Sequence, residues 1–247
     1  MPDHPGRGGQ GRGFPPLRHG RAAGQGEEGP RALPAPAPPG AGPRAPGQGS
    51  HQGARRVSGR LDRDYFEELY AGSKDPWNFE TSDYEREKYA RTLEALGGRR
   101  FGRALEAGAS IGVFTRMLAG RCDELLAVDV SAKAVAAARE RLRGQSHVRV
   151  ERRTLPEEMP EGPFDLIVAS EVLYYFTREE MLAMLNGFEN ILAPGGVLLA
   201  VHWRRETRTY PLQGDEVHEL LTAHTSLALT ESVAEPDYRL DLFEDRG

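Results

Sequence analysis

The chain has 247 residues and a formal net charge of −5 at pH 7. Residues 1–57 hold 14 of the 29 Gly and 11 of the 18 Pro, and they carry eight Arg against three acidic residues. That segment has a charge of +5, which leaves −10 on residues 58–247. Because binding to nucleic acid needs a basic face, this acidic remainder argues against a nucleic-acid partner.

Residues 1–57 contain almost no apolar side chain larger than Ala. Such a segment buries too little surface to offset its ordering entropy, so we expect a disordered Gly/Pro/Arg-rich tail. Its Arg/Gly composition leaves an RNA-associated role open, although a solvated linker, or a start codon assigned too far upstream, is the simpler interpretation. The tail lacks the apolar core of a signal peptide.

Two whole-chain features bear on location. No run of ~20 apolar residues is present, so no membrane span is expected. The single Cys122 excludes an internal disulfide and fits a reducing cytoplasm. The His and Cys residues also lack metal-ligand spacing, so no metal site is expected.

Hydrophobic periodicity predicts one domain over residues 58–247. Two helices, at 61–71 and 84–96, flank a turn with two aromatic residues at 75–79. Apolar runs of strand length then alternate with amphipathic runs of helix length. The expected strands are 104–107, 125–130, 148–152, 164–169 and 197–203, then 227–233 and 238–244; the expected helices are 113–119, 132–142, 178–192 and 214–224.

Local signals mark several of these boundaries. Ser131 is a predicted N-cap, and Thr177 with Glu180 forms a predicted capping box. Pro194-Gly195-Gly196 predicts the end of the preceding helix. Strands alternating with helices in this order require right-handed crossovers and helices on both faces. The fold class is therefore α/β: a doubly wound, mostly parallel seven-stranded sheet, Rossmann-like, covered by the N-terminal helices.

A Gly loop follows the first expected strand and indicates a nucleotide cofactor. The strand ends in Glu106 and Gly108, Gly112 opens the next helix, and Asp129 ends the second strand. A dinucleotide site needs closely spaced glycines next to a pyrophosphate, which the carboxylate of Glu106 would repel. A carboxylate instead suits the cationic end of S-adenosylmethionine, while Asp129 can accept hydrogen bonds from both ribose hydroxyls. This pattern disfavours a dehydrogenase that uses nicotinamide dinucleotide.

In a doubly wound sheet, the ligand lies at the carboxyl ends of the strands where the strand order reverses. The segments that follow the first and fourth strands should therefore face one another. With the segments after the second and third strands, this adds five residues to the expected cofactor site: Ala109, Val130, Thr154, Leu155 and Ser170, with Glu171 beside them.

Several strings together resemble the nodulation protein S group of class I methyltransferases over about residues 61–200. They are Asp75-Pro76-Trp77, Tyr84-Glu85-Arg86, Leu105-Glu106-Ala107-Gly108, Gly112 to Ala119 and Phe164 to Tyr175. The resemblance implies the fold described above and S-adenosylmethionine as methyl donor. It implies that Glu106, Gly108, Gly112 and Asp129 bind the donor, and that Trp77, Arg86 and Tyr89 cover it.

The best-known members of that group methylate an amino group of a deacetylated chitooligosaccharide, so the resemblance implies N-methylation of a small-molecule amine, with an amino sugar as one candidate. Three departures bear on this. Ala109-Ser110-Ile111 replaces a smaller run, and Thr154-Leu155 stands where an Asp is common. Residues 202–218 match nothing in the oligosaccharide enzymes, which leaves the acceptor open.

An amine must be neutral to attack a methyl donor, so a proton acceptor is expected near the crevice. Glu171 is the first candidate and His202, near the end of its strand, the second. Tyr174 and Tyr175 would pack under the sheet or shield the sulfonium. An O-methyltransferase for a small hydroxylated metabolite and a module that binds the donor without turnover are the alternatives. The sequence does not give the oligomeric state.

Overall fold

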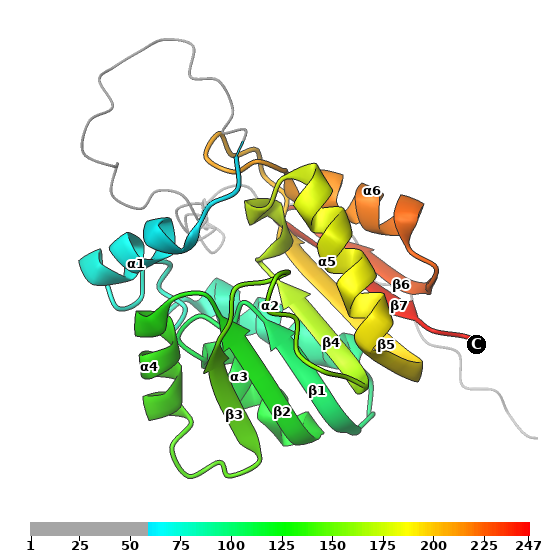
Figure 1. Ribbon diagram of the computed structural model, residues 1–247, viewed down its shortest axis with the longest axis horizontal. Helices are drawn as coiled ribbons and strands as arrows, with labels where there is room; N and C mark the ends of the chain where they lie inside the picture. The colour runs from blue at the N-terminus through cyan, green and yellow to red at the C-terminus, as the bar shows by residue number, and fades with distance from the viewer. Residues whose placement is uncertain (1–58) are drawn as a thin grey trace, which may run out of the picture. The chain divides into compact units, whose positions relative to one another are not determined.

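The computed structural model describes residues 59–247 (Figure 1). Residues 1–58 lie outside the described part, and with them the predicted tail. Helices α1 (Arg63–Gly72) and α2 (Asp83–Ala95) come first. The rest of the order is β1 (Phe101–Ala107), α3 (Val113–Leu118), η1 (Ala119–Arg121), β2 (Cys122–Asp129), α4 (Ala132–Arg141), β3 (Val148–Arg152), β4 (Phe164–Ser170), η2 (Leu173–Tyr175), α5 (Arg178–Ile191), β5 (Leu192–Trp203), α6 (Gly214–His224), β6 (Ala228–Ala234) and β7 (Tyr238–Glu244).

The described strands form one sheet in the order β3-β2-β1-β4-β5-β7-β6. The first five strands are parallel, and β7 pairs antiparallel with both β5 and β6. The order reverses between β1 and β4, which are neighbours although β2 and β3 separate them in sequence. This is the predicted mostly parallel, doubly wound sheet, and its switch point lies between β1 and β4.

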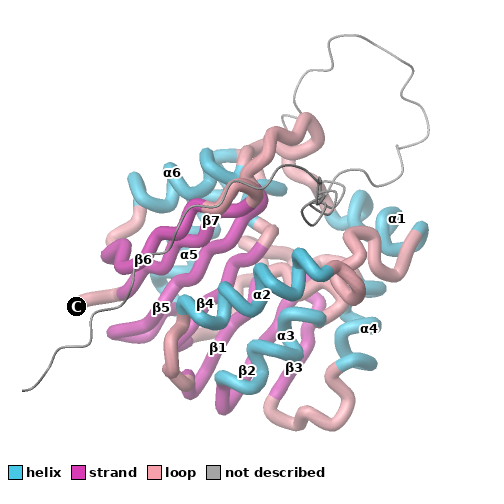
Figure 2. Tube along the Cα trace, turned by 180° about the vertical axis from the view of Figure 1, so that it is seen from behind, coloured by secondary structure: helices cyan, strands magenta, loops and turns pink. Residues whose placement is uncertain are grey.

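Helices cover both faces of the sheet. Helices α5 and α6 lie over the face in front in Figure 1, and α2 and α3 lie over the opposite face, in front in Figure 2. Two apolar clusters correspond to this arrangement: one includes Met184 and Phe188 of α5, and the other Phe114 and Leu118 of α3. Because both faces are covered, β4 and β5 contain continuous apolar runs, at 166–169 and 197–201, instead of alternating ones.

The predicted capping signals are present. The Ser131 hydroxyl accepts a hydrogen bond from the Ala134 N–H at the start of α4. Thr177 and Glu180 form a reciprocal capping box at α5, which ends before Pro194 as expected. The turn at 75–79 is held by Asp75, whose carboxylate accepts hydrogen bonds from the N–H groups of Phe79 and Glu80, both at 2.9 Å.

Some strand boundaries differ from the expected ones. β1 and β2 each begin three residues early, at Phe101 and Cys122, and these two residues are in register. The sequence pattern did not include these starts because Arg103 and Glu124 interrupt the apolar runs. The two residues pair in register, at an end of the sheet where Arg103 is partly buried and Glu124 is exposed. β5 begins at Leu192, which pairs with Phe164 before an irregularity in register.

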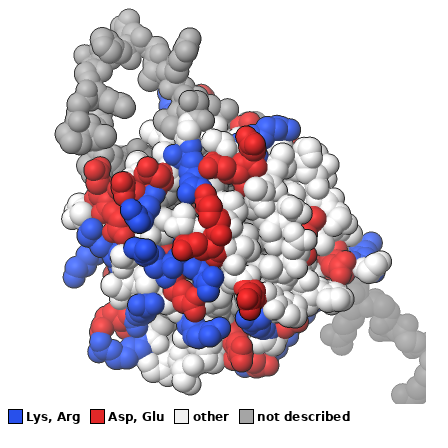
Figure 3. All heavy atoms as spheres, in the orientation of Figure 1, with Lys and Arg blue, Asp and Glu red and all other residues white. Residues whose placement is uncertain are grey.

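No helix within residues 59–247 is long and apolar enough to cross a membrane. On the face shown in Figure 3, acidic and basic side chains are interleaved around α1 and α4. Many are paired at the surface, as with Lys133 and Glu67 at 3.3 Å. Surface pairs of this kind contribute little to stability, typically ~0–1 kcal/mol.

Candidate active site

A tight turn follows β1 at the switch point. The N–H groups of Gly108 and Ala109 both donate to the carbonyl oxygen of Val128, each at 2.9 Å. Gly108 has a φ of 80°, and a Cβ there would lie 2.9 Å from the side chain of Val172. Only glycine takes this conformation readily and leaves the gap between the β1 and β4 loops open.

Asp129 ends β2 beside this turn. Its Oδ2 accepts a hydrogen bond from the Ser110 N–H at 2.8 Å, and its Oδ1 accepts one from the Ser131 N–H at 2.9 Å. Burial raises the pKa of the Asp129 carboxyl to about 6, so the group is ionised at neutral pH. A carboxylate held in this way keeps lone pairs for two further hydroxyl donors.

Glu106, near the end of β1, is a buried carboxyl group that lacks a complete set of partners. The side chain is 3% exposed, and its Oε2 has no hydrogen-bond partner among the described residues. Burial raises the pKa of this carboxyl to about 8, so it is mostly protonated at neutral pH in the absence of a nearby cation. Such a group is suited to a cationic ligand, which would stabilise the carboxylate.

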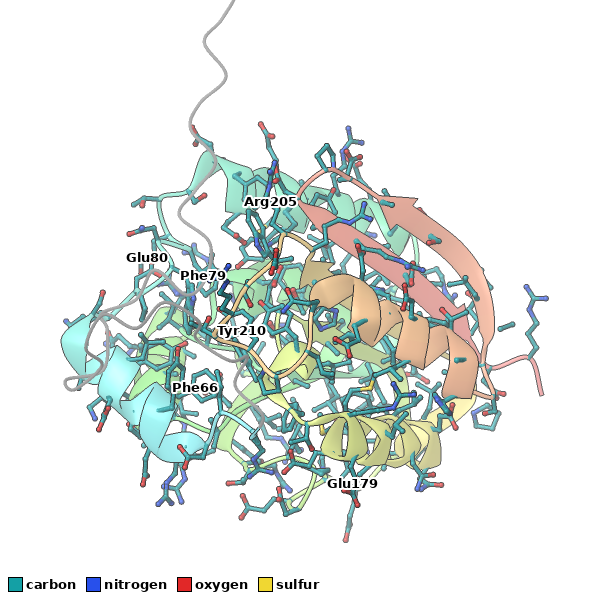
Figure 4. All side chains as sticks on the ribbon, turned by 90° about the horizontal axis from the view of Figure 1, so that it is seen from above. Phe66, Phe79, Glu80, Glu179, Arg205 and Tyr210 are labelled. Carbon is teal, nitrogen blue, oxygen red and sulfur yellow. The ribbon has the colours of Figure 1, made fainter. Side chains whose placement is uncertain are left out.

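These residues line one pocket at the carboxyl ends of the parallel strands. It encloses about 1310 Å³ of space, part of it open to solvent. On one wall, the rings of Trp77 and Phe79 stack with their centroids 5.4 Å apart. The ring of Tyr70 meets that of Trp77 edge-on, with 5.7 Å between the centroids. In Figure 4, Phe66 of α1 and Phe79 lie around this end of the fold with Tyr210, whereas Glu179 points outward.

At the β4 side, Glu171 joins three elements. Its Oε1 accepts a hydrogen bond from Lys88 of α2 at 2.8 Å, and its Oε2 accepts one from the Trp203 N–H at 3.0 Å and another from the Tyr174 hydroxyl. Lys88 also lies 2.8 Å from a carboxylate oxygen of Glu85. Burial alone would lower the pKa of the Lys88 ammonium, but the two carboxylates raise it above its ordinary value.

Most residues expected at the site do line this pocket: Trp77, Tyr89, Glu106, Gly108, Ala109, Asp129, Val130, Thr154, Leu155, Ser170 and Glu171. Tyr174 and Tyr175 line it as well, although both are buried. Their rings meet edge-on with 4.7 Å between the centroids, and the ring of Tyr174 stacks on that of Tyr210 with 4.8 Å between the centroids. Their rings therefore pack against protein and border the pocket at the same time.

Three expected site residues lie outside the pocket lining. Arg86 is 65% exposed and pairs with Asp83 on the solvent face of α2. Gly112 has a φ of 78° at the N-cap of α3, where a Cβ would lie 3.0 Å from that of Ala138. This close approach lets α3 pack on α4, and the contact of Gly112 with the donor stays a prediction.

His202 is also outside the lining, and its expected position at the rim is wrong. The side chain is fully buried, because α6 and β7 cover the end of β5. Its Nε2 accepts a hydrogen bond from the Leu173 N–H at 3.2 Å, and its Nδ1 lies 3.2 Å from Nε2 of His218. His218 in turn bonds Asp241 at 2.8 Å. Burial lowers the pKa of His202, which therefore stays neutral and holds the η2 turn.

Sequence reasoning missed Glu85, Lys88 and Trp203, which line the pocket. Glu85 and Lys88 lie on a highly charged helix, where such residues usually face solvent. Their burial depends on Glu171, which is 83 positions from Lys88 in the chain, so no local signal marks them. Within residues 59–247, no three His, Cys, Asp or Glu side chains gather as metal ligands.

A seven-stranded sheet of this order, with an acidic residue before the Gly turn and another at the end of β2, defines the class I S-adenosylmethionine-dependent methyltransferase fold. A model of the family described as Nodulation protein S (NodS) matches residues 63–226. The chain therefore belongs to the nodulation protein S family. The resemblance seen in the sequence motifs is confirmed, and so is the predicted fold class.

Individual relatives agree with this assignment. Nodulation protein S of Bradyrhizobium diazoefficiens is 38% identical over 129 residues, which cover 51% of this chain and 61% of that protein. The match to the protein of the same name from Sinorhizobium fredii is 34% identical over 128 residues and covers 50% of this chain and 58% of that protein. The chain thus spans about three fifths of the length of these curated relatives.

Two solved structures are similar along nearly their whole length. The N-methyltransferase NodS of Bradyrhizobium japonicum, in complex with S-adenosyl-L-homocysteine, aligns with a TM-score of 0.68 at 27% identity. That alignment covers 76% of this chain and 100% of the other. A putative methyltransferase from Pseudomonas syringae aligns with a TM-score of 0.59 at 39% identity and covers 65% of this chain and 98% of the other.

Proposed function

We propose that the chain transfers a methyl group from S-adenosylmethionine to an amine of a small molecule. The observation that carries this proposal is the incompletely paired, buried carboxyl group of Glu106 in a pocket that also holds Asp129. When bound, the donor supplies an activated methyl group on a sulfonium, so the protein needs mainly to orient the reactants and exclude water.

In this proposal, each loop at the carboxyl ends of the strands has a role toward the donor. Glu106 binds the ammonium group, and Asp129 accepts hydrogen bonds from the ribose hydroxyls. Thr154 and Leu155 contact the adenine. The aromatic wall around Trp77 and Tyr89 covers the donor from the side of the N-terminal helices.

Three observations favour an amine as acceptor. Two acidic side chains, Glu85 and Glu171, line the end of the pocket beside β4 and β5, and they share a single ammonium group, that of Lys88. When both are ionised the cluster carries one negative charge in excess, which an ammonium group of the acceptor would balance. The family relation to an N-methyltransferase points to the same class.

The acceptor class can be tested with labelled donor. The full-length chain should transfer label from S-adenosylmethionine to a deacetylated chitooligosaccharide and leave the fully acetylated oligosaccharide unmodified. The acetylated compound keeps the hydroxyl groups and lacks the free amine, so it separates N- from O-methylation. Labelling of both compounds would favour the O-methyltransferase alternative, and labelling of neither would exclude an amino sugar of this type.

Glu106 gives a pH-dependent prediction. Its pKa of about 8 in the free protein should fall when an ammonium group binds beside it, so donor binding should release a proton at pH 7. Affinity should accordingly rise with pH up to about 8. Titration calorimetry with S-adenosylhomocysteine in two buffers of different ionisation enthalpy measures this release. Equal enthalpies in both buffers would contradict it, and Glu106→Gln should abolish the difference.

We further propose a cytoplasmic location, which Cys122 supports because it is a buried free thiol. The proposal does not involve residues 1–57, and removing them should leave donor binding unchanged. Loss of binding on truncation would instead favour a function centred on the Arg/Gly-rich segment.

A further inference from the structure

The pocket has two ends with different chemistry. In the proposed function, the donor occupies the end formed by the loops after β1, β2 and β3. The acceptor is then left with the end beside β4 and β5. Glu85, Lys88 and Glu171 meet there, and all three line the pocket although their side chains are only 11%, 2% and 12% exposed. The following inference rests on the proposed function and concerns the proton of the acceptor.

Glu171 is poorly suited to take that proton. Its two oxygens accept hydrogen bonds from the Lys88 ammonium, the Tyr174 hydroxyl and the Trp203 N–H. These three donors already occupy both oxygens, so neither oxygen is free to bind the ammonium group of an acceptor. The φ of 56° at Glu171, together with the hydrogen bond from its N–H to the Val201 carbonyl oxygen, also fixes its backbone.

Glu85 is less well stabilised as a carboxylate. Its strong partner is Lys88, one turn further along the same helix, with Nζ at 2.8 and 3.0 Å from its two oxygens. Lys88 divides its charge between Glu85 and Glu171. Burial raises the pKa of the Glu85 carboxyl, Lys88 opposes the rise, and the charge of Glu171 across the pocket adds to it. Tyr89, on the same helix, is the other titratable group that bonds Glu85.

We propose that Glu85 is the group that takes the proton from the ammonium group of the acceptor. One N–H bond breaks, its electron pair stays on nitrogen, and an O–H bond forms on Glu85. That lone pair then forms the N–C bond to the methyl carbon while the C–S bond breaks and its electron pair stays on sulfur. The product leaves as a methylated ammonium ion, and Glu85 later returns its proton to solvent.

Lys88 has a complementary positioning role in this scheme. Its raised pKa keeps it protonated, so it is not itself the base. By bonding both carboxylates it links Glu171 to Glu85 and holds Glu85 at the pocket wall. An entering ammonium group completes the charge balance of the cluster, and this favours acceptors that are cationic in solution over neutral hydroxyl compounds.

The direct test is the pH profile of Glu85→Gln in the full-length chain, with a deacetylated chitooligosaccharide as acceptor. We expect kcat to fall by about 100-fold or more. The acidic limb of the wild-type kcat profile should disappear, because the group that must ionise is gone, while S-adenosylhomocysteine affinity stays unchanged. The matched control is Glu87→Gln, an exposed glutamate on the same helix, which should behave as wild type. A kcat for Glu85→Gln close to that of wild type, with the acidic limb retained, would overturn the proposal.

A second measurement does not depend on the acceptor. Infrared difference spectra recorded against pH should contain the C=O stretch of a carboxylic acid that titrates above the usual range of glutamate. Because the pKa values of Glu106 and Asp129 are also raised, the comparison is made between Glu106→Gln and the double variant Glu85→Gln/Glu106→Gln. The double variant should lose the signal of one further carboxyl. Identical titrations in Glu106→Gln and the double variant would overturn the assignment. If the signal behaves as expected but the amino sugar is not methylated, the choice of acceptor is at fault and the assignment of Glu85 stands.

Discussion

Replacing Lys88 by methionine is expected to lower the free energy of unfolding by about 3–5 kcal/mol, because it leaves two buried carboxylates without their shared cation. Lys88 is 2% exposed and lies 2.8 Å from both Glu85 and Glu171. Methionine has nearly the same length, so the change removes charge more than volume. Urea unfolding at pH 7 measures the effect, and S-adenosylhomocysteine binding by the folded fraction shows whether the pocket persists.

Two controls separate charge from packing. Lys133→Met removes a lysine that is 52% exposed and paired with Glu67 at the surface, and it should cost no more than ~1 kcal/mol. Adding Glu85→Gln and Glu171→Gln to Lys88→Met should recover a large part of the loss, because no buried negative charge then remains in this cluster. A loss below ~1 kcal/mol for Lys88→Met alone would show that the cluster is less buried or more hydrated than described.

Asp129→Ala is expected to weaken donor binding by about 1.5–3 kcal/mol, through loss of charge-assisted hydrogen bonds to the ribose. This corresponds to a roughly 10- to 150-fold increase in Kd for S-adenosylhomocysteine. In the wild type, affinity should also fall as the pH drops below the Asp129 pKa of about 6, because the protonated carboxyl is a poorer acceptor.

The matched control for this variant lies on the same strand. Asp123, near the start of β2, is 62% exposed and pairs with Arg100 away from the pocket. Asp123→Ala should bind S-adenosylhomocysteine as tightly as wild type. Because Asp129 also accepts hydrogen bonds from the Ser110 and Ser131 N–H groups, a thermal melt must show that Asp129→Ala remains folded. Unchanged affinity in a folded variant would remove Asp129 from the donor site.

The donor side of the pocket was predictable because its residues follow strands directly. Glu106, Gly108 and Asp129 stand at fixed offsets from apolar runs, and parallel strands bring their carboxyl ends to one edge. The sheet was predictable for a related reason, since short apolar runs alternate with amphipathic ones along the whole domain. The resemblance to a known family supplied Trp77 and Tyr89, which local patterns do not single out.

The acceptor side was less predictable because it depends on contacts between distant segments. Arg86 and Lys88 are two residues apart on α2, and the charge pattern does not tell which one faces inward; Arg86 faces solvent and Lys88 is buried. His202 was expected at a rim because it lies near the carboxyl end of its strand. The antiparallel pairing with β7 and the packing of α6 place it in the core instead.

Binding of an adenosyl sulfonium donor in this pocket underlies the roles given to Glu106 and Asp129. Titration calorimetry of the full-length chain with S-adenosylhomocysteine tests it most directly, with nicotinamide adenine dinucleotide as the control ligand. We expect micromolar binding of the first compound at one site and no binding of the second. Absence of S-adenosylhomocysteine binding, or tighter binding of the dinucleotide, would contradict the roles given to Glu106 and Asp129.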